Sequence, residues 1–543
     1  MKSYKIVIPS WLEMNLEMQA ETGCLYPAFI QLGGEPLYTH IMRSYDQFKN
    51  NVEFVFILAD DAPKLSVKKE SGFDWKELRI SDSKSIADSV SRALVDVHSS
   101  QTVVIHMGDT LVTFGFLKEK QDTIFVKNKD DIYRWTSVAK DSNGGIKVLT
   151  DRECSLEDKS QSVCVGVFLF SDSVLIRECL QVALILNEPK YDPFFIAIEK
   201  YSQKRAVSLN TPPCWYDCGH VDTFYKSRLD FTNLRHFNTL NYDSERGLVT
   251  KRSIEVKSFR HQVRWYRQVP DSIASFLPRI YESDDGEDPF LTMELLTIPT
   301  LSDLFVNQRL RIGAWNTVAK KISNVLELFK NLSYESLIAS DLAEDVYINK
   351  TRERLELFCQ QSPTLAEHWV VSDAGIISIE YVLKKLNQFA EKTQIFNTRN
   401  LTPIHGDLCF SNIMYDIRGA SVKLIDPRGS FGVPGIYGDS LYDKAKLLHS
   451  YCGGYDLILS DNYEVHTSDA GELNLIVAKS DYHLKVQQIF NRVIFPGQSE
   501  YFQCQAIQAL LFLSMLPLHR DRIDRQRGML ALGLKLFGEI IKK

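Results

Sequence analysis

Short apolar stretches alternate with amphipathic ones along the first hundred residues. Apolar runs occupy residues 4–8, 52–58 and 102–106. Between them, residues 36–48 and 85–97 carry apolar side chains at intervals of three and four, which is the spacing of one face of an α-helix. An order of strand, helix, strand and helix is typical of a parallel sheet. The pattern therefore predicts an α/β unit whose ligand site lies at the carboxyl ends of the strands.

The rest of the chain has a different pattern. Residues 247–253 are predicted to form an edge strand and residues 291–296 a second strand. From residue 301 onward helical periodicity dominates, and it is clearest over residues 314–330, 376–392, 481–494 and 503–518. A few strands followed by many helices predict an α+β unit, with a small lobe at about 236–300 and a helical large lobe at about 301–543.

The junction between the two units is expected near residue 235. Periodicity loosens over residues 225–246, and no stretch rich in Pro, Gly or Ser separates the two patterns. A short connection predicts two domains, residues 1–235 and 236–543, packed against each other.

Composition narrows the classes of protein. The 543 residues are 44% hydrophobic and 24% charged, with a net charge of -6 and a pI near 6.1. A nucleic-acid binder would show a high pI, so no nucleic-acid partner is expected. No apolar run approaches the roughly 20 residues of a membrane span, and the N-terminus has the pattern of a strand and not of a signal peptide. We expect a cytoplasmic protein with reduced cysteines and no membrane insertion; the oligomeric state is not predictable.

The strongest chemical pattern lies between His405 and Asp426. Asp407 precedes Asn412 by five residues, and an apolar strand then leads to Asp426. Phosphoryl transfer from a nucleoside triphosphate requires an acid that orients the attacking hydroxyl, and an amide and an acid that hold magnesium. A capped turn would also explain Asp407 and Asn412, but it does not predict the second acid at the end of a hydrophobic strand.

This pattern resembles the aminoglycoside phosphotransferase and choline kinase branch of the kinases. The matching residues are the H-x-D-x-x-x-x-N arrangement of His405 to Asn412 and the Asp-Pro-Arg-Gly segment that begins at Asp426. The resemblance implies a two-lobed, protein-kinase-like fold, ATP and Mg²⁺ as cofactors, and a small-molecule hydroxyl acceptor. It assigns the acceptor hydroxyl to Asp407 and the metal to Asn412 and Asp426, with His405 packed beneath the loop.

The same resemblance implies a donor site in the small lobe. Lys251 falls at the position of the lysine that pairs with the donor phosphates, and Gln262 stands where related kinases carry its glutamate partner. Gln262 is expected to accept a hydrogen bond from Lys251. The backbone from Glu294 to Leu296 is expected to meet the adenine edge, although an ordinary buried strand is the alternative reading.

Two further groups of residues have weaker assignments. Residues 438–447 are similar to a helix of phosphotransferases from bacterial capsule loci, and its Asp439 and Asp443 are expected to fix the catalytic loop; a helix cap and a surface acid are the alternatives. Residues 516–526 concentrate charge after an apolar helix. Three of their side chains could bind an anionic acceptor or lie in a solvated loop: His519, Arg520 and Arg525.

The first unit carries two acids at predicted strand ends. Asp109 follows the strand 102–106, and Asp217 lies in Trp215-Tyr-Asp-Cys-Gly219, a W-x-D-x-G segment. Two such acids from distant positions can share one Mg²⁺ beside a triphosphate. A turn cap and a helix-terminal acid are the alternative readings. Gly108 is expected to permit the close approach of a ligand.

These segments resemble the sugar-1-phosphate nucleotidyltransferases, and residues 85–90 and 166–170 are similar to two more segments of that family. The resemblance implies a GT-A-like, Rossmann-like mostly parallel sheet and a second nucleoside triphosphate, such as CTP or UTP. Residues 9–18 depart from the family because they lack its glycine-rich loop and contain Glu13 and Glu17. Ala28 replaces its lysine, for which three cations are candidate substitutes: Lys127, Arg134 and Lys200.

Together the two resemblances imply a bifunctional enzyme. One unit would phosphorylate a sugar, polyol or amino alcohol, and the other would convert that phosphate to a nucleotide-activated precursor of a bacterial surface polysaccharide (capsule). The alternative is an active kinase whose degenerate first unit only binds a ligand or acts as a scaffold.

Overall fold

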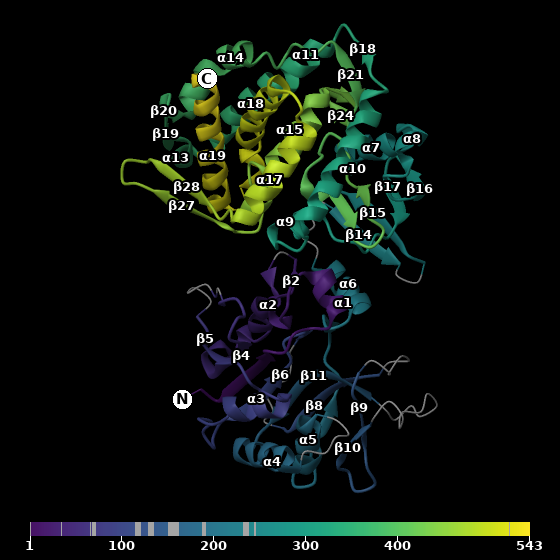
Figure 1. Cartoon of the computed structure of the whole chain (residues 1–543), viewed down its shortest axis with the longest axis vertical. Helices are drawn as coiled ribbons and strands as arrows, with labels where there is room; N and C mark the ends of the chain where they lie inside the picture. The colour runs from purple at the N-terminus through teal and green to yellow at the C-terminus, as the bar shows by residue number, and fades with distance from the viewer. Residues whose placement is uncertain are drawn as a thin grey trace. The chain divides into compact units, whose positions relative to one another are not determined.

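The computed structural model describes residues 2–33, 35–65, 67, 72–113, 121–128, 135–149, 162–186, 192–231, 238–243, 246–520 and 522–543. The chain divides into two compact units, Met1–Asn233 and Leu234–Lys543 (Figure 1). Residue 235, where the sequence places the boundary, lies outside the described residues. The two units are described separately below.

The first unit is built on a mixed sheet with a parallel centre. Its central strands lie in the order β6-β1-β4-β5 and run parallel. Their bounds are β1 Tyr4–Ser10, β4 Val52–Ala59, β5 Asp74–Ile80 and β6 Thr102–His106. The antiparallel strand β11 (Ser162–Phe170) pairs with the free side of β6 and continues the sheet. The predicted strands and the predicted parallel α/β sheet are confirmed.

Helices cover both faces of this sheet (Figure 1). Ile6 and Ile8 of β1 belong to one apolar core and Val7 to the other, as expected for a strand whose side chains alternate. The first core includes residues of α1 (Leu16–Thr22), α2 (Leu37–Ser44) and α6 (Val221–Asp230). The second includes residues of α3 (Ile86–Ala93), α4 (Ser173–Leu186) and α5 (Pro193–Ser202). The predicted helices are therefore present, but both are shorter than expected.

A two-stranded ladder brings distant parts of the first unit together at the end of β6. There β7 (Thr110–Val112) pairs antiparallel with β13 (Trp215–Asp217). Gly108 lies just before β7, and a Cβ there would be 2.9 Å from the carbonyl oxygen of Pro9. Gly108 therefore permits the close approach of its own backbone to the end of β1. The sequence had suggested instead that it permits the close approach of a ligand.

The second unit begins with a four-stranded antiparallel sheet in the order β14-β15-β17-β16. The strands are β14 Asn238–Asp243, β15 Leu248–Ser253, β16 Ile280–Asp284 and β17 Phe290–Glu294. The prediction of an edge strand at residues 247–253 is wrong, because β14 pairs with the outer side of β15. β14 was not predicted, because most of its residues are polar and do not show the alternation of apolar and polar positions that is typical of a strand. Helix α7 (Val256–Gln268) joins β15 to the rest of this lobe.

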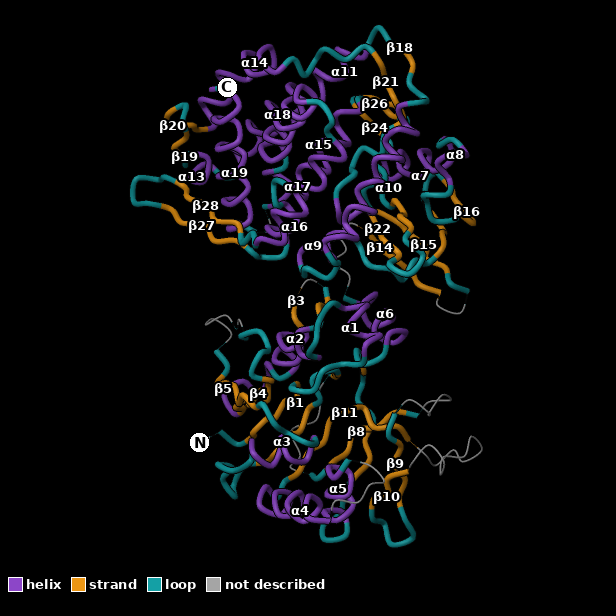
Figure 2. The backbone as a smooth tube through the Cα atoms, in the orientation of Figure 1, coloured by secondary structure: helices purple, strands orange, loops and turns teal. Residues whose placement is uncertain are grey.

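The remainder of the second unit is mainly helical, as predicted. Its longer helices are α10 Ile312–Lys330, α12 Lys350–Gln361, α14 Ile379–Thr393, α15 Ser440–Tyr451, α17 Asp481–Ile494, α18 Gln498–Ser514 and α19 Ile523–Lys542. Figure 2 also shows two hairpins that periodicity did not predict. They are β19 (Trp369–Ser372) with β20 (Gly375–Ser378), and β27 (Tyr463–Thr467) with β28 (Leu473–Val477), and they contact α19. Among the described helices, none combines the length and apolarity that a membrane span requires. Each cysteine of the described part of the chain is a free thiol.

Gly429 tests the packing between α7 and the segment that follows Asp426. Its φ is 68°, and a Cβ would lie 2.1 Å from the carbonyl oxygen of His261. Gly247 has nearly the same φ, 67°, with nothing within 4 Å of a Cβ. We expect Gly247→Ala to cost about 1–2 kcal/mol for the left-handed backbone, and Gly429→Ala to cost distinctly more because the backbone of α7 must also move. Denaturant unfolding followed by circular dichroism measures both, and equal losses would contradict the close fit.

Candidate active sites

The two halves of the predicted kinase motif are joined through the backbone. Asp407 and Asn412 lie between β21 (Asn400–Pro403) and β22 (Ile413–Asp416), and Asp426 follows β23 (Ser421–Leu424), which pairs with β22. The amide of Ile425 donates to the carbonyl of Asn412 at 3.0 Å, and the amide of Arg428 donates to the carbonyl of His405 at 2.8 Å. The chain on both sides of Asp426 is therefore anchored to the loop that carries Asp407.

Asp407 has a polar partner at each carboxylate oxygen. Nδ2 of Asn412 donates to Oδ2 at 3.1 Å, and Nζ of Lys446 forms an ion pair with Oδ1 at 2.8 Å. Burial opposes the charge of Lys446, but the Asp407 carboxylate, with smaller contributions from Tyr442 and Cys409, outweighs burial and raises the pKa of this lysine above its usual value. Lys446 lies on α15 inside a segment that the sequence singled out, yet it was not assigned. The sequence could have indicated Lys446, because it follows Asp443 by three residues and so lies on the same face of the helix.

Asp426 is held in an unusual backbone conformation beside Lys251. Its φ is 57°, a region that non-glycine residues seldom adopt and that is concentrated at functional sites. Nζ of Lys251, which is buried, lies 2.7 Å from Oδ1 of Asp426. Nε2 of Gln262 donates to the carbonyl of Pro427 at 3.1 Å. Gln262 therefore fixes the backbone next to Asp426. The hydrogen-bonding partner of Lys251 is Asp426 and not Gln262, which the sequence had suggested.

Asp443 anchors the loop that carries Asp407. Its Oδ2 accepts the amide of His405 at 2.7 Å, and its Oδ1 accepts the amide of Gly406 at 2.8 Å. Burial raises the pKa of Asp443 to about 7. His405 is also buried, which lowers its pKa to about 4 and keeps the ring neutral. Its Nδ1 accepts the amide of Asp407 at 3.3 Å, so His405 supports the loop from within, where the sequence placed it.

Asp439 serves the start of α15. Its Oδ1 accepts the amide of Leu441 at 3.0 Å as the N-cap, and its Oδ2 accepts the hydroxyl of Tyr347 at 2.8 Å. Of the two acids in this segment, Asp439 caps the helix while Asp443 holds the loop.

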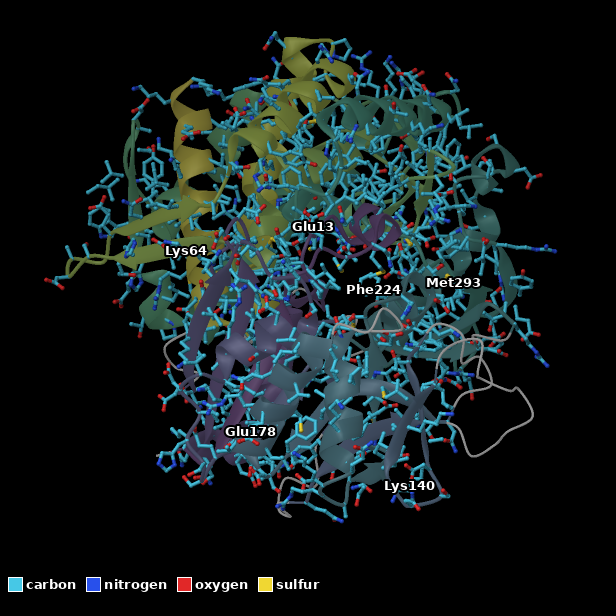
Figure 3. All side chains as sticks on the ribbon, turned by 60° about the horizontal axis from the view of Figure 1, so that its bottom comes forward. Glu13, Lys64, Lys140, Glu178, Phe224 and Met293 are labelled. Carbon is cyan, nitrogen blue, oxygen red and sulfur yellow. The ribbon has the colours of Figure 1, made fainter. Side chains whose placement is uncertain are left out.

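The segment expected to meet adenine lies at the end of β17. The amide of Glu294 donates to the carbonyl of Arg279 at 2.8 Å, and the amide of Leu295 donates to the carbonyl of Gly247 at 2.8 Å. Both amides serve the sheet, and Leu296 follows the last paired residue of the strand. Figure 3 labels Met293 on the same strand.

Asp109 and Asp217 lie side by side in the first unit. The β7–β13 ladder and the bond from the amide of Cys218 to the carbonyl of Asp109, 2.8 Å, join their backbones. A Cβ on Gly219 would lie 2.7 Å from Oδ2 of Asp109 and 3.4 Å from Oδ1 of Asp217. The glycine of the W-x-D-x-G segment therefore allows the two carboxylates to approach one space. Burial, and then the charge of Asp217, raise the pKa of Asp109 to about 6.

Asp217 already accepts several hydrogen bonds. Its Oδ2 accepts from Trp135 Nε1 at 3.0 Å, His220 Nδ1 at 2.8 Å and Thr223 Oγ1 at 2.8 Å, and its Oδ1 accepts the amide of Gly219 at 3.0 Å. Burial alone would raise the pKa of Asp217, but these donors, led by His220, lower it. The hydrogen bond to Asp217 raises the pKa of His220 in turn. His220 was not predicted from the sequence, although it directly follows the motif glycine, Gly219.

The departures from the nucleotidyltransferase pattern are visible in the chain after β1. Glu13, labelled in Figure 3, lies between β1 and α1 and accepts from Nε2 of Gln19 at 3.3 Å. Asn15 caps α1 through the amide of Met18. Ala28 is fully buried. Of the three candidate substitutes, Lys127 ends β8 (Thr123–Lys127), Lys200 lies on α5, and Arg134 lies outside the described residues.

The charged residues near the C-terminus are only partly loop residues. Arg525 lies in α19, where it donates to the carbonyl of Leu459 at 3.0 Å, and His519 ends a short 3-10 turn. Arg520 is exposed. Helix α19 therefore starts inside the segment that the sequence treated as a charged tail.

The two candidate sites were compared with metal-binding clusters. Within the described part of the chain, no three His, Cys, Asp or Glu side chains come together as a metal site. Each site provides two oxygen-bearing side chains, Asn412 with Asp426 and Asp109 with Asp217. Magnesium keeps waters and substrate phosphates among its ligands, so one or two carboxylates per ion fit this metal.

Comparison with known proteins gives matches among solved structures alone. No protein-family model and no curated protein matches the chain. The UTP-bound UGPase from Acinetobacter baumannii is 13% identical and covers 42% of this chain and 93% of its own, with a TM-score of 0.33. HddC from Yersinia pseudotuberculosis is 14% identical and covers 42% of this chain and 100% of its own, with a TM-score of 0.31. The CTP:phosphocholine cytidylyltransferase from Streptococcus pneumoniae is 11% identical and covers 43% of this chain and 100% of its own, with a TM-score of 0.33.

The different roles of the two buried acids of α15 can be separated by mutation. Asp443→Asn places an amide N–H against one of the two backbone amides that Asp443 accepts, so we expect a loss of about 1–3 kcal/mol in the free energy of unfolding. Asp439→Asn should cost less, because Asn is as good an N-cap as Asp. Urea unfolding monitored by circular dichroism compares the two, and a larger loss for Asp439→Asn would refute the assignment.

Proposed function

We propose that the second unit is an ATP-dependent kinase that phosphorylates a hydroxyl group of a small molecule. One observation carries the proposal: Lys251 pairs with Asp426, the neighbouring amide of Ile425 donates to the carbonyl of Asn412, and Nδ2 of Asn412 donates to Asp407. These are the residue types that phosphoryl transfer needs, and the order of contacts leads from the donor side to the acceptor side. A turn that merely satisfies its own backbone would not bring Lys251 from another sheet onto Asp426.

Each residue then has a role in the transfer. Asp407 orients the acceptor hydroxyl and takes its proton at the carboxylate, as the new bond forms to the γ-phosphorus and ADP leaves with the bridging oxygen. The Asp426 carboxylate and Oδ1 of Asn412 fit magnesium, which would supply positive charge against the donor phosphates. Lys251 adds a fixed positive charge there, and the backbone from Glu294 to Leu296 would receive adenine.

We propose for the first unit a nucleotidyl transfer at Asp109 and Asp217. The phosphate of the acceptor would attack the α-phosphorus of a second nucleoside triphosphate such as CTP or UTP, and pyrophosphate would leave. The position of both carboxylates around Gly219 supports this proposal. Two units in one chain would pass the phosphorylated intermediate at a raised local concentration, toward a nucleotide-activated precursor of a surface polysaccharide.

A second candidate function for the first unit is ligand binding without transfer. The donors that surround Asp217, His220 above all, favour it, because they occupy the oxygens that a metal would need. The acids Glu13 and Glu17 after β1 also oppose a triphosphate.

The kinase proposal predicts that Asp407→Ala abolishes ATP-dependent phosphorylation. Loss of a general base typically lowers turnover by about 10²–10⁴-fold. ADP release by the full chain would be measured across a panel of sugars, polyols, amino alcohols and their acids. Asp416→Ala is the matched control, because Asp416 lies in the adjoining hairpin and its Oδ1 only accepts the amide of Arg418, at 2.9 Å. Full turnover by Asp407→Ala, with its fold intact, would reject the proposal.

The transfer proposal predicts pyrophosphate release by the full chain. Each of four nucleoside triphosphates would be incubated with magnesium and a panel of phosphorylated sugars and alcohols. Because the pKa of Asp109 is raised to about 6, its carboxyl group becomes protonated and loses its charge as the pH falls through that value, and release should decline there. Asp109→Asn should be inactive at every pH. No release by the wild type with any pair would favour the ligand-binding function.

A further inference from the structure

Four basic side chains interact electrostatically near the Asp407 loop: Lys350, Arg354, Arg428 and Lys446. Lys446 is the ion-pair partner of Asp407. Arg428 passes directly over the residue before Asp407, since a Cβ on Gly406 would lie 2.8 Å from the Cβ of Arg428. Nη1 of Arg428 donates to the hydroxyl of Tyr442 on α15 at 3.0 Å. These two cations therefore flank the catalytic acid from α15 and from the segment after Asp426.

The other two cations come from α12. Lys350 and Arg354 are four residues apart and so lie on one face of this helix. Nη1 of Arg354 donates to the carbonyl of Ser514 at 2.9 Å, which fixes the arginine on α18. Lys350 is partly buried, and within the described residues its Nζ has neither a hydrogen bond nor an ion pair. Burial and then the charges of Arg428, Arg354 and Lys446 lower the pKa of Lys350 to about 6, although Asp407 opposes them.

The backbone before Lys350 is also unusual. Asp345–Asn349 form a turn of π-helix between α11 (Ala339–Glu344) and α12. Such turns are rare in proteins overall, but where they occur they often lie at functional sites. The hydroxyl of Tyr347 in this turn donates to Asp439 at the start of α15. The turn therefore fixes α12, with Lys350 at its first position, relative to the helix that carries Lys446.

Within the described part of the chain, two acids act on Lys350 and Arg354. Asp407 acts on Lys350 and is itself paired with Lys446, and Glu353 acts on Arg354 from the same helix. Like charges held together away from water repel each other, and an anion placed among them would relieve that repulsion. Phosphate and carboxylate are the groups that arginine and lysine bind best.

We propose that the hydroxyl compound phosphorylated at Asp407 carries a phosphate or carboxylate group, and that Lys350 and Arg354 bind this anion. The inference rests on the proposed kinase function and narrows its substrate class. The donor side is separate, because Lys251 and the Glu294–Leu296 segment belong to the small sheet while Lys350 and Arg354 belong to the helical part of the same unit. A site for the anionic end of the acceptor would place its hydroxyl toward Asp407.

Matched acceptors test the proposal in the full chain. Each set compares one neutral compound with two acidic ones: glycerol with glycerate and glycerol phosphate, and glucose with glucuronate and glucose 6-phosphate. We expect an acidic member to have the higher kcat/KM. Lys350→Gln and Arg354→Gln should each lower kcat/KM for that acceptor by about 10–100-fold, the value of a charge-assisted hydrogen bond, and leave the KM for ATP unchanged. Lys384→Gln, at an exposed position on α14, is the control.

A binding measurement keeps the anion site testable without turnover. The full chain would be saturated with a non-hydrolysable ATP analogue and magnesium, and the rate at which an amine reagent labels Lys350 would be followed by mass spectrometry with Lys384 as the internal reference. Inorganic phosphate should slow labelling of Lys350 selectively, and Arg354→Gln should weaken this protection.

The two measurements separate the failure of each idea. Selective protection of Lys350 without phosphorylation of any compound would preserve the anion site and remove the kinase function. Phosphorylation of neutral members as efficient as that of the acids, with no protection of Lys350, would overturn the anion site and preserve the kinase. An increase in the KM for ATP in Lys350→Gln, with no change for the acceptor, would assign the cluster to the donor and also overturn the proposal.

Discussion

The loop that carries Asp407 depends on one buried acid, Asp443. Asp443 accepts the amides of His405 and Gly406 and so fixes the backbone from which Asp407 projects. The cost of burying this acid is visible in its raised pKa, and two backbone hydrogen bonds offset that cost. One helical turn further along α15, Lys446 meets the side chain of Asp407. A single helix thereby positions both the backbone of this loop and the side chain of Asp407.

The small lobe is attached to the same loop through short polar contacts. Nε1 of Trp265 on α7 donates to the carbonyl of Ile404 at 2.7 Å, and Gln262 on the same helix donates to Pro427. Gly429 lets the chain after Asp426 touch the backbone of α7. Helix α7 is therefore the element through which the small sheet, with Lys251, is attached to the loop that carries Asp407. At position 262 the amide of Gln262 contributes to this attachment by its hydrogen bond to Pro427.

Local pattern predicted most of the architecture, and tertiary context supplied the rest. The strands around Val7, Val55 and Val104 and the long helices carry strong periodicity, so their type followed from the sequence. β14 did not, because its polar residues are stabilised by pairing with β15 and not by an apolar face. The motif acids were recognisable from spacing alone. Lys446 and His220 lie next to motif residues but were not assigned, because position in the sequence does not reveal which carboxylate a side chain meets across the fold. Lys350 had no motif residue beside it, and nothing local distinguishes a basic side chain that meets others across the fold from a solvated one.

The π-helical turn at Asp345–Asn349 also affects how this part of the fold tolerates a change in length. Such a turn holds one residue more than the α-helical turn it replaces. Deleting that residue would restore the α-helical ladder and leave the following helix facing nearly the same way, so Lys350 and Arg354 would keep their common face. A deletion between Lys350 and Arg354, within the regular helix, would instead turn Arg354 by about 100° away from Lys350. The length of the chain can therefore change in the turn without separating these two side chains, and cannot change between them.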